Sequence, residues 1–159
     1  MQVVAYPVTV PSGVTRGDWV HYVTACILYD LELISDCLSR VCSPIMCRQI
    51  ESSMAKYSWV DTDGKTSRLS STTYANNVLK YGQELLKNHT LFETRSAELQ
   101  TLYRRVYRIF AHAISCHNEQ LQRYNLLPTI NSYYTSFTAF ATFHGLLPEQ
   151  EIFAGGMQP

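Results

Sequence analysis

Cysteines and histidines at short, regular intervals are the residues of this chain best suited to hold a metal ion. Five cysteines occur, and Cys37, Cys42 and Cys47 follow one another five positions apart. His112 and His117 also lie five positions apart. Thiolate and imidazole are ligands that Zn²⁺ prefers in proteins. Spacing alone does not decide which two of the three cysteines would be ligands, because both neighbouring pairs have the same interval.

Three arginines near the histidines are suited to bind an anion. Arg104 and Arg108 lie four residues apart and Arg105 lies three before Arg108, spacings at which helical side chains are neighbours. Guanidinium groups donate paired hydrogen bonds that match the oxygens of phosphate or carboxylate. The three side chains would then hold one small acidic group. The alternative is an ordinary solvated basic face, which the spacing does not exclude.

A helix over Leu102–His117 must position these residues. It contains good helix formers, no proline or glycine occurs from Arg95 to Leu127, and apolar residues recur every three or four positions. That apolar series is Leu99, Leu102, Val106, Ile109 and Ala113. Residues five apart on a regular helix point roughly 140° away from each other. His112 and His117 therefore share a metal only in the crease between two faces, or if the helix distorts near Ser115. The alternative, more common at this spacing, is two unrelated histidines.

Four helices and one hairpin are predicted in all. Thr15 or Asp18 caps the first long helix, and Pro128 suits the first turn of the last one. Asp63 and Gly64 predict a tight turn inside the hairpin. In chain order the elements are an extended lead-in over Val3–Val10, a helix from Thr15 to Cys37, a hairpin over Tyr57–Leu69, and helices over Tyr74–Asn88, Leu102–His117 and Pro128–Gly145. The predicted fold class is mainly α, a four-helix-bundle core with a small β-hairpin insertion.

The length and composition are those of one globular domain. With 159 residues, 46% hydrophobic and 16% charged, the chain is long enough to bury a core. We expect one domain over residues 1–159, with an extended lead-in over 1–14, a helical core over 15–147 and a tail over 148–159. Trp19, in the first turn of the first helix, is expected to be a core anchor, with exposed recognition as the alternative.

Charge is balanced overall but unevenly distributed. The formal net charge is zero and the pI is about 6.9, which argues against sequence-independent binding of nucleic acid. Residues 1–36 carry four acids against one arginine, whereas residues 95–123 carry five arginines against two glutamates. Two faces of opposite charge imply two partners or one partner and one modified ligand.

The first residues and the cysteine count point to a cytoplasmic protein. Met1–Gly13 has no basic leader and contains Pro7 and Pro11, so we expect neither a secretory signal nor a membrane span. An odd number of cysteines in such a chain favours free thiols or metal ligands over disulfides, and buried structural thiols are the simplest interpretation of Cys26 and Cys116. No glycine-rich phosphate loop, H-E-x-x-H pair or G-x-S-x-G elbow is present.

Several stretches, in this order, resemble the Mob/phocein family of kinase co-activators and adaptors. That family's lead-in, in which an acid and a tryptophan open the first long helix, resembles VPSGVTRGDWV, where the pair is Asp18 and Trp19. Its Cys-x4-Cys with a following proline and methionine resembles CLSRVCSPIM, and its hairpin resembles YSWVDTDG. Its basic cluster and His-x4-His resemble RRVYRIFAHAISCH. The resemblance covers nearly the whole chain, although the family usually has a further stretch before the lead-in, which this chain nearly lacks.

The resemblance implies one structural Zn²⁺ bound by Cys37, Cys42, His112 and His117. It selects this register because Cys42, and not Cys47, precedes the Pro-Ile-Met run, although an inserted Ser43 departs from the commoner Cys-Pro. Two thiolates and two neutral imidazoles complete a tetrahedron with no open position, which is typical of a structural site. Such an ion would tie the end of the first helix to the later helix and add to folding stability.

The resemblance also implies two protein-binding surfaces. The Arg104, Arg105 and Arg108 set matches the family's phosphopeptide-binding cluster, so a phosphorylated upstream kinase or scaffold is the expected ligand. Asp18, with Trp19 beside it, matches an acidic position that in the family receives the basic amino-terminal segment of an NDR/LATS-type kinase of the AGC group. Relatives often carry an acid at the position of Val14, so this surface is less acidic than usual.

The function implied is a non-enzymatic adaptor or co-activator that couples such a kinase to a phosphorylated partner. We expect a monomer without nucleic acid or membrane span, acting in cell-cycle, cytokinesis or Hippo-like signalling, in the cytoplasm or else the nucleus, spindle pole or basal body. One alternative is a phocein-like subunit of a phosphatase-kinase scaffold. Another, a zinc-dependent hydrolase, is disfavoured because four protein ligands leave no place for water and no glutamate lies between the histidines.

Overall fold

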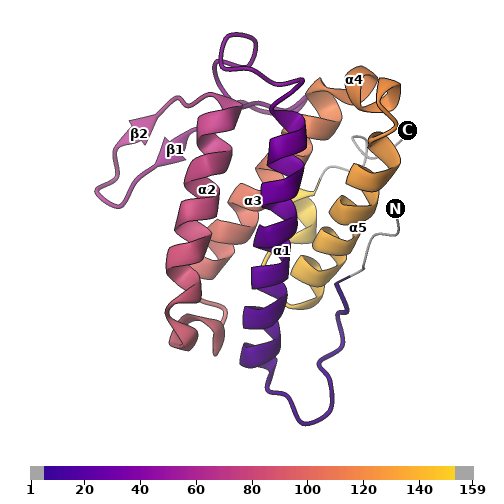
Figure 1. Ribbon diagram of the computed structural model, residues 1–159. Helices are drawn as coiled ribbons and strands as arrows, with labels where there is room; N and C mark the ends of the chain where they lie inside the picture. Colours follow the sequence, from indigo (N-terminus) through magenta and orange to yellow (C-terminus); the bar gives the residue numbers. More distant parts are fainter. Residues whose placement is uncertain (1–5, 153–159) are drawn as a thin grey trace.

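The computed structural model describes residues 6–152, which form a bundle of long helices (Figure 1). The long helices are α1 (Arg16–Leu38), α2 (Ser71–Leu86), α3 (Ala97–Cys116) and α5 (Leu127–Phe143). The shorter elements are the hairpin strands β1 (Trp59–Val60) and β2 (Thr66–Ser67), the 3-10 turns η1 (His89–Phe92) and η2 (Glu149–Glu151), and α4 (Asn118–Arg123). The predicted fold class is therefore confirmed. Residues 1–5 of the predicted lead-in and 153–159 of the predicted tail lie outside the described residues.

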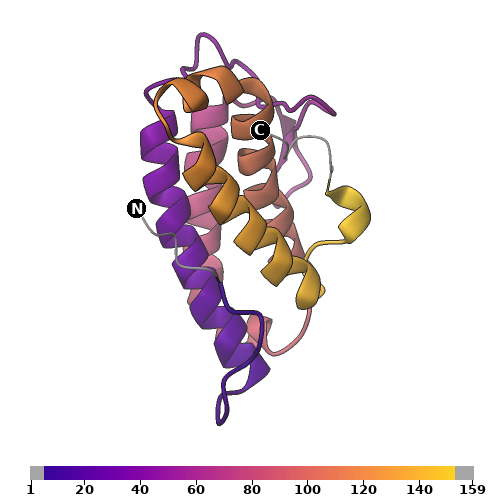
Figure 2. The same cartoon turned by 90° about the vertical axis from the view of Figure 1, so that its right-hand side faces the viewer.

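Apolar stripes at helical spacing hold the long helices together. The stripe of α1 runs from Val20 to Leu38 and is buried throughout, and the predicted apolar series of α3 from Leu99 to Ala113 is buried as well. Helix α1 packs against α2, α2 against α3 and α3 against α5, and in the view of Figure 2 α5 crosses the side of the bundle. Aromatic rings fill the α3–α5 contact, where Tyr103 and Phe137 stack with centroids 5.6 Å apart.

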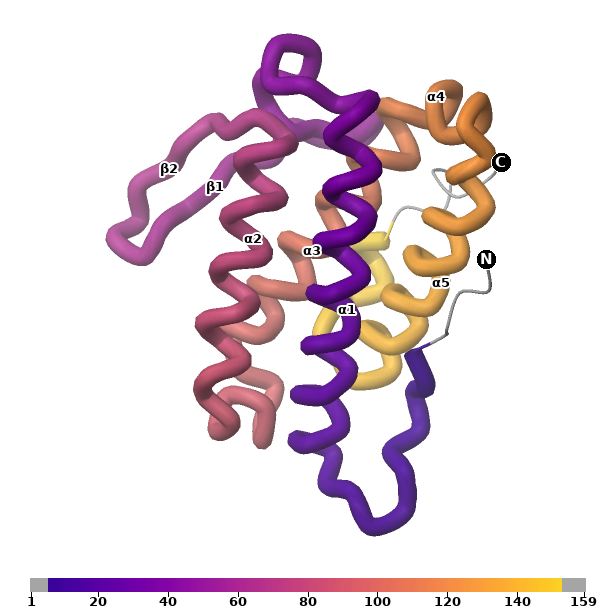
Figure 3. Tube along the Cα trace, in the orientation of Figure 1, coloured from indigo at the N-terminus to yellow at the C-terminus, as the bar shows by residue number. Residues whose placement is uncertain are grey.

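The segment between α1 and β1 passes over one end of the bundle, beside the end of α3 (Figure 3). It has little regular structure of its own and is held by backbone hydrogen bonds to distant segments. The amide of Ser71 donates to the carbonyl of Cys47 at 3.2 Å, and the amide of Ile50 donates to the carbonyl of Leu69 at 2.9 Å. Because Ser71 opens α2, these bonds fix the segment against the start of that helix.

The predicted hairpin is confirmed, and its turn has the expected chemistry. Strands β1 and β2 pair antiparallel with Trp59 opposite Ser67. Gly64 has φ +82°, a conformation that glycine adopts without strain. Trp59 lies edge-on to Tyr74 of α2 with ring centroids 5.5 Å apart, so the hairpin is attached to the bundle by its tryptophan.

The predicted helices differ by one to five residues from the observed ones at their ends, and two of these differences have a clear cause. Helix α2 begins at Ser71 rather than Tyr74, because Ser70 is the N-cap and accepts a hydrogen bond from the amide of Thr73. Helix α3 ends at Cys116, and His117 has φ −122° and ψ 21° before α4 starts. The single continuous helix predicted to run as far as His117 is therefore broken at that residue.

The lead-in is tied to α1 and to the end of α5 by side chains. Tyr6 donates its hydroxyl to Asp30 at 2.6 Å, and the indole of Trp19 donates to the carbonyl of Pro7 at 2.9 Å. The Nε2 of His144 lies 2.8 Å from the carbonyl oxygen of Val8. These contacts hold residues 6–8 against the bundle.

Candidate metal centre and arginine face

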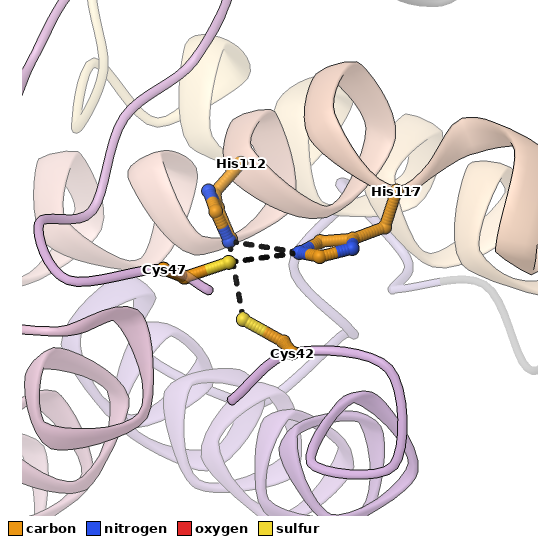
Figure 4. Close-up of side chains that lie close together, drawn as sticks. All are labelled: Cys42, Cys47, His112 and His117. Carbon is orange, nitrogen blue, oxygen red and sulfur yellow. Dashed lines mark hydrogen bonds between the residues drawn. The ribbon is translucent and has the colours of Figure 1, made fainter. Parts of the chain in front are cut away.

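Two cysteines and two histidines meet at the end of α3 (Figure 4). Cys42 and Cys47 come from the segment that passes over the bundle, His112 from the last turn of α3, and His117 from the break that follows. One ligand atom from each side chain lies within 4.8 Å of all the others. We call this set the metal centre. It contains Cys42, His112 and His117 as predicted.

The prediction that Cys37 is the fourth ligand is wrong, and Cys47 takes that place. Cys37 lies within α1, one residue before the buried Leu38, and its side chain is exposed. A step of one residue turns a side chain by 100°, so Cys37 points away from the face that packs on the bundle. Cys47 lies beyond the helix end, where the chain folds back toward α3.

The break after Cys116 explains how two histidines five residues apart face each other. On a regular helix they would diverge, whereas here their Nε2 atoms are 3.2 Å apart. The sequence allowed for a distortion near Ser115, and the observed break lies two residues later, at His117. His117 is thus oriented by the non-helical backbone rather than by the face of α3.

The distances at the metal centre fit a tetrahedral zinc ion. Zn–S bonds of about 2.3 Å and Zn–N bonds of about 2.0–2.1 Å separate tetrahedral ligands by roughly 3.3–3.8 Å. Cys42 Sγ lies 3.3 Å from His112 Nε2, and Cys47 Sγ lies 3.4 Å from His117 Nε2. The donor set and its spacing therefore suit Zn²⁺, which these four residues would hold as a structural ion.

Burial disfavours the charged form of both imidazoles, and a backbone carbonyl orients one of them. His112 Nδ1 donates to the carbonyl of Glu51 at 2.7 Å, which leaves Nε2 as a free acceptor directed at the other ligands. Burial lowers the pKa of His112, and burial followed by the nearby His112 lowers the pKa of His117 to about 4. Two neutral imidazole nitrogens that face each other are compatible only with a proton or a cation between them.

Burial has the opposite effect on the thiol of Cys42. It raises the pKa of Cys42 to about 12, an effect that the hydrogen bond with Ser71 partly offsets. A buried thiolate needs a positive charge beside it, and a bound metal ion supplies that charge. With four protein ligands the tetrahedron has no position left for a reacting water, so the centre is suited to stabilise the fold rather than to catalyse hydrolysis.

The predicted arginines lie on α3 before the metal centre, and two of them line one cavity. Arg104 and Arg108 border a space of about 430 Å³, together with Tyr57 and Glu151. The Nε of Arg104 lies 3.1 Å from a carboxylate oxygen of Glu151. Arg108 donates to the hydroxyl of Tyr74 at 3.2 Å and lies over the ring of Tyr57. We call Arg104, Arg105 and Arg108 the arginine face.

Arg105 is directed toward the hairpin instead. It donates to the carbonyl of Val60 at 2.7 Å, and its guanidinium lies 3.8 Å from the ring centroid of Trp59 and 4.7 Å from that of Tyr81. Burial lowers its pKa. Arg105 thus joins α3 to the hairpin and does not line the cavity that Arg104 and Arg108 border. Sequence spacing could not identify these partners, because Val60 and Trp59 lie more than forty residues away and Tyr81 lies on another helix.

The predicted kinase-binding residues lie at the start of α1. Asp18 is exposed, and its amide donates to the N-cap Thr15 at 3.1 Å. Trp19 is half-buried and stacks on the exposed Tyr22, with centroids 5.6 Å apart. A cavity of about 540 Å³, which sequence reasoning missed, extends from these rings along α1 to Asp30.

No membrane-spanning helix is found among residues 6–152, because none of the helices there combines the required length with the required hydropathy.

Comparison with known proteins identifies the family. A family model described as Mob1/phocein matches residues 2–154. The "Maintenance of ploidy protein mob1" of Schizosaccharomyces pombe is 25% identical over 156 residues, which span 91% of this chain and 74% of that protein. The "DBF2 kinase activator protein MOB1" of Saccharomyces cerevisiae is 22% identical over 152 residues, 88% of this chain and 48% of that protein. The "MOB kinase activator-like 2A" of Arabidopsis thaliana is 20% identical over 155 residues, 91% of this chain and 72% of that protein.

The chain spans about half the length of the Saccharomyces cerevisiae relative, but the family model covers nearly all of it. Its motifs, its helical fold and this match agree, and the protein belongs to the Mob1/phocein family.

Proposed function

We propose that this protein is a kinase co-activator: an adaptor, stabilised by one Zn²⁺, that binds a kinase on one side and a phosphorylated protein on another. Membership of a family whose relatives are named kinase activators is the observation that carries this proposal. Such activators regulate an enzyme and are not enzymes, so the chain is a non-enzymatic regulator, as the sequence predicts. The closed ligand set of the metal centre agrees with that assignment.

The kinase would bind along α1, at its start around Asp18 and Trp19. Helix α1 carries Asp18, Asp30, Glu32 and Asp36 but only Arg16 as a basic residue. Exposed Tyr22 and half-buried Trp19 add apolar surface beside the first of these acids. Acidic and aromatic groups on one helix suit a basic amphipathic segment, such as the amino-terminal segment of an NDR/LATS-type kinase.

The phosphorylated partner would bind at the arginine face. Arg104 and Arg108 border one cavity, and a phosphate would replace the carboxylate of Glu151 as the anion beside Arg104. A phosphate carries up to two negative charges and three acceptor oxygens, so it is a stronger ligand for guanidinium than one carboxylate. Arg105, already oriented by Trp59, would contribute from the hairpin side.

Zinc would connect these two surfaces through the fold. Bound to Cys42 and Cys47 on one side and to His112 and His117 on the other, it would fix the segment after α1 to the end of α3. The arginine face lies on α3 and the acidic residues lie on α1, so the relative position of the two surfaces would depend on that link. We further propose that the protein works as a cytoplasmic monomer in cell-cycle or Hippo-like signalling.

A kinase-activation assay tests the proposal. The zinc-loaded chain is added to an NDR/LATS-type kinase from the same organism, and phosphorylation of a peptide substrate is measured. We expect activation that weakens with added salt and is lost in Asp18→Lys. Glu119→Lys, a charge reversal at an exposed site on α4, is the matched control and is expected to activate like the unmodified chain. Failure of the unmodified chain to bind or activate any such kinase would overturn the proposal.

A further inference from the structure

A cavity of about 570 Å³ lies between α1 and α2 and extends to the metal centre, since Cys42 and His112 also line it. Its volume falls within the range of roughly 300–1,000 Å³ that is typical of small-molecule sites. The inner wall is apolar and well buried, and is formed by Leu38, Ile50, Ala75 and Ile109. It shares no lining residue with the cavity that Arg104 and Arg108 border.

The outer part of the cavity is negatively charged. Glu32 and Asp36, four residues apart on α1, both line it, and both are exposed. No lysine or arginine lines it, and neither carboxylate makes an ion pair within residues 6–152. Two like charges at this spacing on a helix repel each other. A cation placed between them would therefore be favoured.

The serine hydroxyls around the cavity add no polar contact for a ligand. The Oγ of Ser35 is inaccessible to solvent, and so to a ligand atom, although Ser35 borders the cavity. The hydroxyl of Ser71 is bonded to Cys42, and that of Ser39 donates to the carbonyl of Asp36. The acidic outer part and the apolar inner wall are therefore the features that select a ligand.

We propose that this cavity binds a small organic amine. The ammonium group lies between the carboxylates of Glu32 and Asp36, and the apolar body lies against Leu38 and Ile109. The cavity is large enough to enclose a whole small molecule, so the ligand is a free amine rather than one side chain of a protein partner. This binding is independent of the proposed kinase activation.

Two compounds with the same body and different charge test the proposal. The zinc-loaded chain, isotopically labelled, is titrated with 2-phenylethylamine and with its neutral analogue 2-phenylethanol, and amide shifts are followed by NMR. We expect the amine to shift signals of Ser35, Ala75 and their neighbours, and to bind roughly tenfold more tightly than the alcohol. Equal affinity for the two compounds, or no shifts at the cavity, would overturn the proposal.

Three variants locate the binding. Glu32→Gln combined with Asp36→Asn is expected to weaken amine binding at least about fivefold, while Glu119→Gln, an exposed acid on α4, is expected to leave it unchanged. Ser35→Leu fills the cavity and is expected to abolish binding in a chain whose circular dichroism is unaltered. Unweakened binding by the double variant would refute the site. So would shifts produced by a lysine-containing peptide but not by the amine, since the cavity would then be a protein-docking surface.

Discussion

His112 and Arg104 lie two turns apart on α3, and the regions around them work in different ways. His112 is 3% exposed and is held by Glu51 on one side and by three metal-binding side chains on the other. Arg104 has 36% of its side chain exposed and forms an ion pair with Glu151. The metal centre is therefore largely buried, whereas the arginine face is more open to water and salt.

This difference separates permanent contacts from exchangeable ones. At the metal centre a bound cation would hold the two thiols and two imidazoles together, and its loss would leave these buried groups without a common partner. At the arginine face each guanidinium already has a partner in the free protein, and an exposed ion pair is worth only about 0–1 kcal/mol. A phosphorylated ligand can displace such a partner, but it cannot replace the metal.

The largest expected effect is the loss of Cys47 compared with Cys37. We expect Cys47→Ser to lower the free energy of unfolding by at least about 3 kcal/mol, because it removes a ligand of a structural metal. Cys37→Ser, an exposed cysteine with the same spacing to Cys42, is the matched control and should change it by less than about 0.5 kcal/mol. Urea unfolding of the zinc-loaded proteins measures both. A larger loss of stability in Cys37→Ser than in Cys47→Ser would show that Cys37 is the ligand.

Acid should destabilise the metal-stripped chain through His117. Its pKa is lowered from 6.5 to about 4 by burial and by His112, so between these values the unfolded state binds a proton that the folded state does not. Stability is then fully present above pH 6.5 and falls as the pH drops toward 4, by about 1–3 kcal/mol. Urea unfolding at pH 7.5 and 5 measures the slope. His117→Asn should flatten it, and a stability that rises on acidification would contradict the assignment.

A phosphopeptide should lose affinity when Arg108 is removed. We expect Arg108→Ala to weaken binding about tenfold or more, because a charge-assisted hydrogen bond contributes roughly 1.5–3 kcal/mol. The matched control is Arg123→Ala, an exposed arginine on α4. Isothermal titration with a phosphopeptide and its unphosphorylated form measures both variants. Equal losses in the two would mean that the arginine face has no specific role.

The smallest expected effect is that of removing the Glu151 carboxylate, which is paired with Arg104 at the arginine face. Glu151→Gln removes the carboxylate from Arg104, and because that pair is exposed we expect phosphopeptide affinity to rise only about two- to fivefold. Glu149→Gln, two residues earlier in η2, is the control. An unchanged affinity would show that Glu151 does not compete with the ligand.

Helical periodicity predicted the helical bundle well, but the sequence predicted only three of the four residues of the metal centre. The apolar stripes of α1 and α3 are buried as their spacing predicts, because a 3.6-residue period specifies one face. The same geometry argues against Cys37 as a metal ligand, because its side chain points 100° away from that of the buried Leu38. The prediction nevertheless chose Cys37, because the Pro-Ile-Met run after Cys42 resembles the family motif. The break at His117 could not be predicted, since no proline or glycine occurs there.

Side-chain partners at the arginine face could not be predicted from local spacing. Arg104 and Arg105 are adjacent and so diverge by about 100° on the helix. Arg105 donates a hydrogen bond to Val60 of the hairpin, and Arg104 donates one to Glu151. Only the tertiary fold brings these residues near the arginines. The roles of these arginines, and of Asp18 and Trp19, in binding partners stay predictions.

X-ray absorption at the zinc edge of the purified chain tests the central claim most directly. We predict one zinc per chain with two sulfur neighbours at about 2.3 Å and two nitrogen neighbours at about 2.0 Å, a spectrum that Cys37→Ser leaves unchanged and Cys47→Ser reduces to one sulfur or none. A chain that binds no zinc, or zinc whose two sulfur neighbours persist in Cys47→Ser, would contradict the claim that Cys42, Cys47, His112 and His117 form the metal centre.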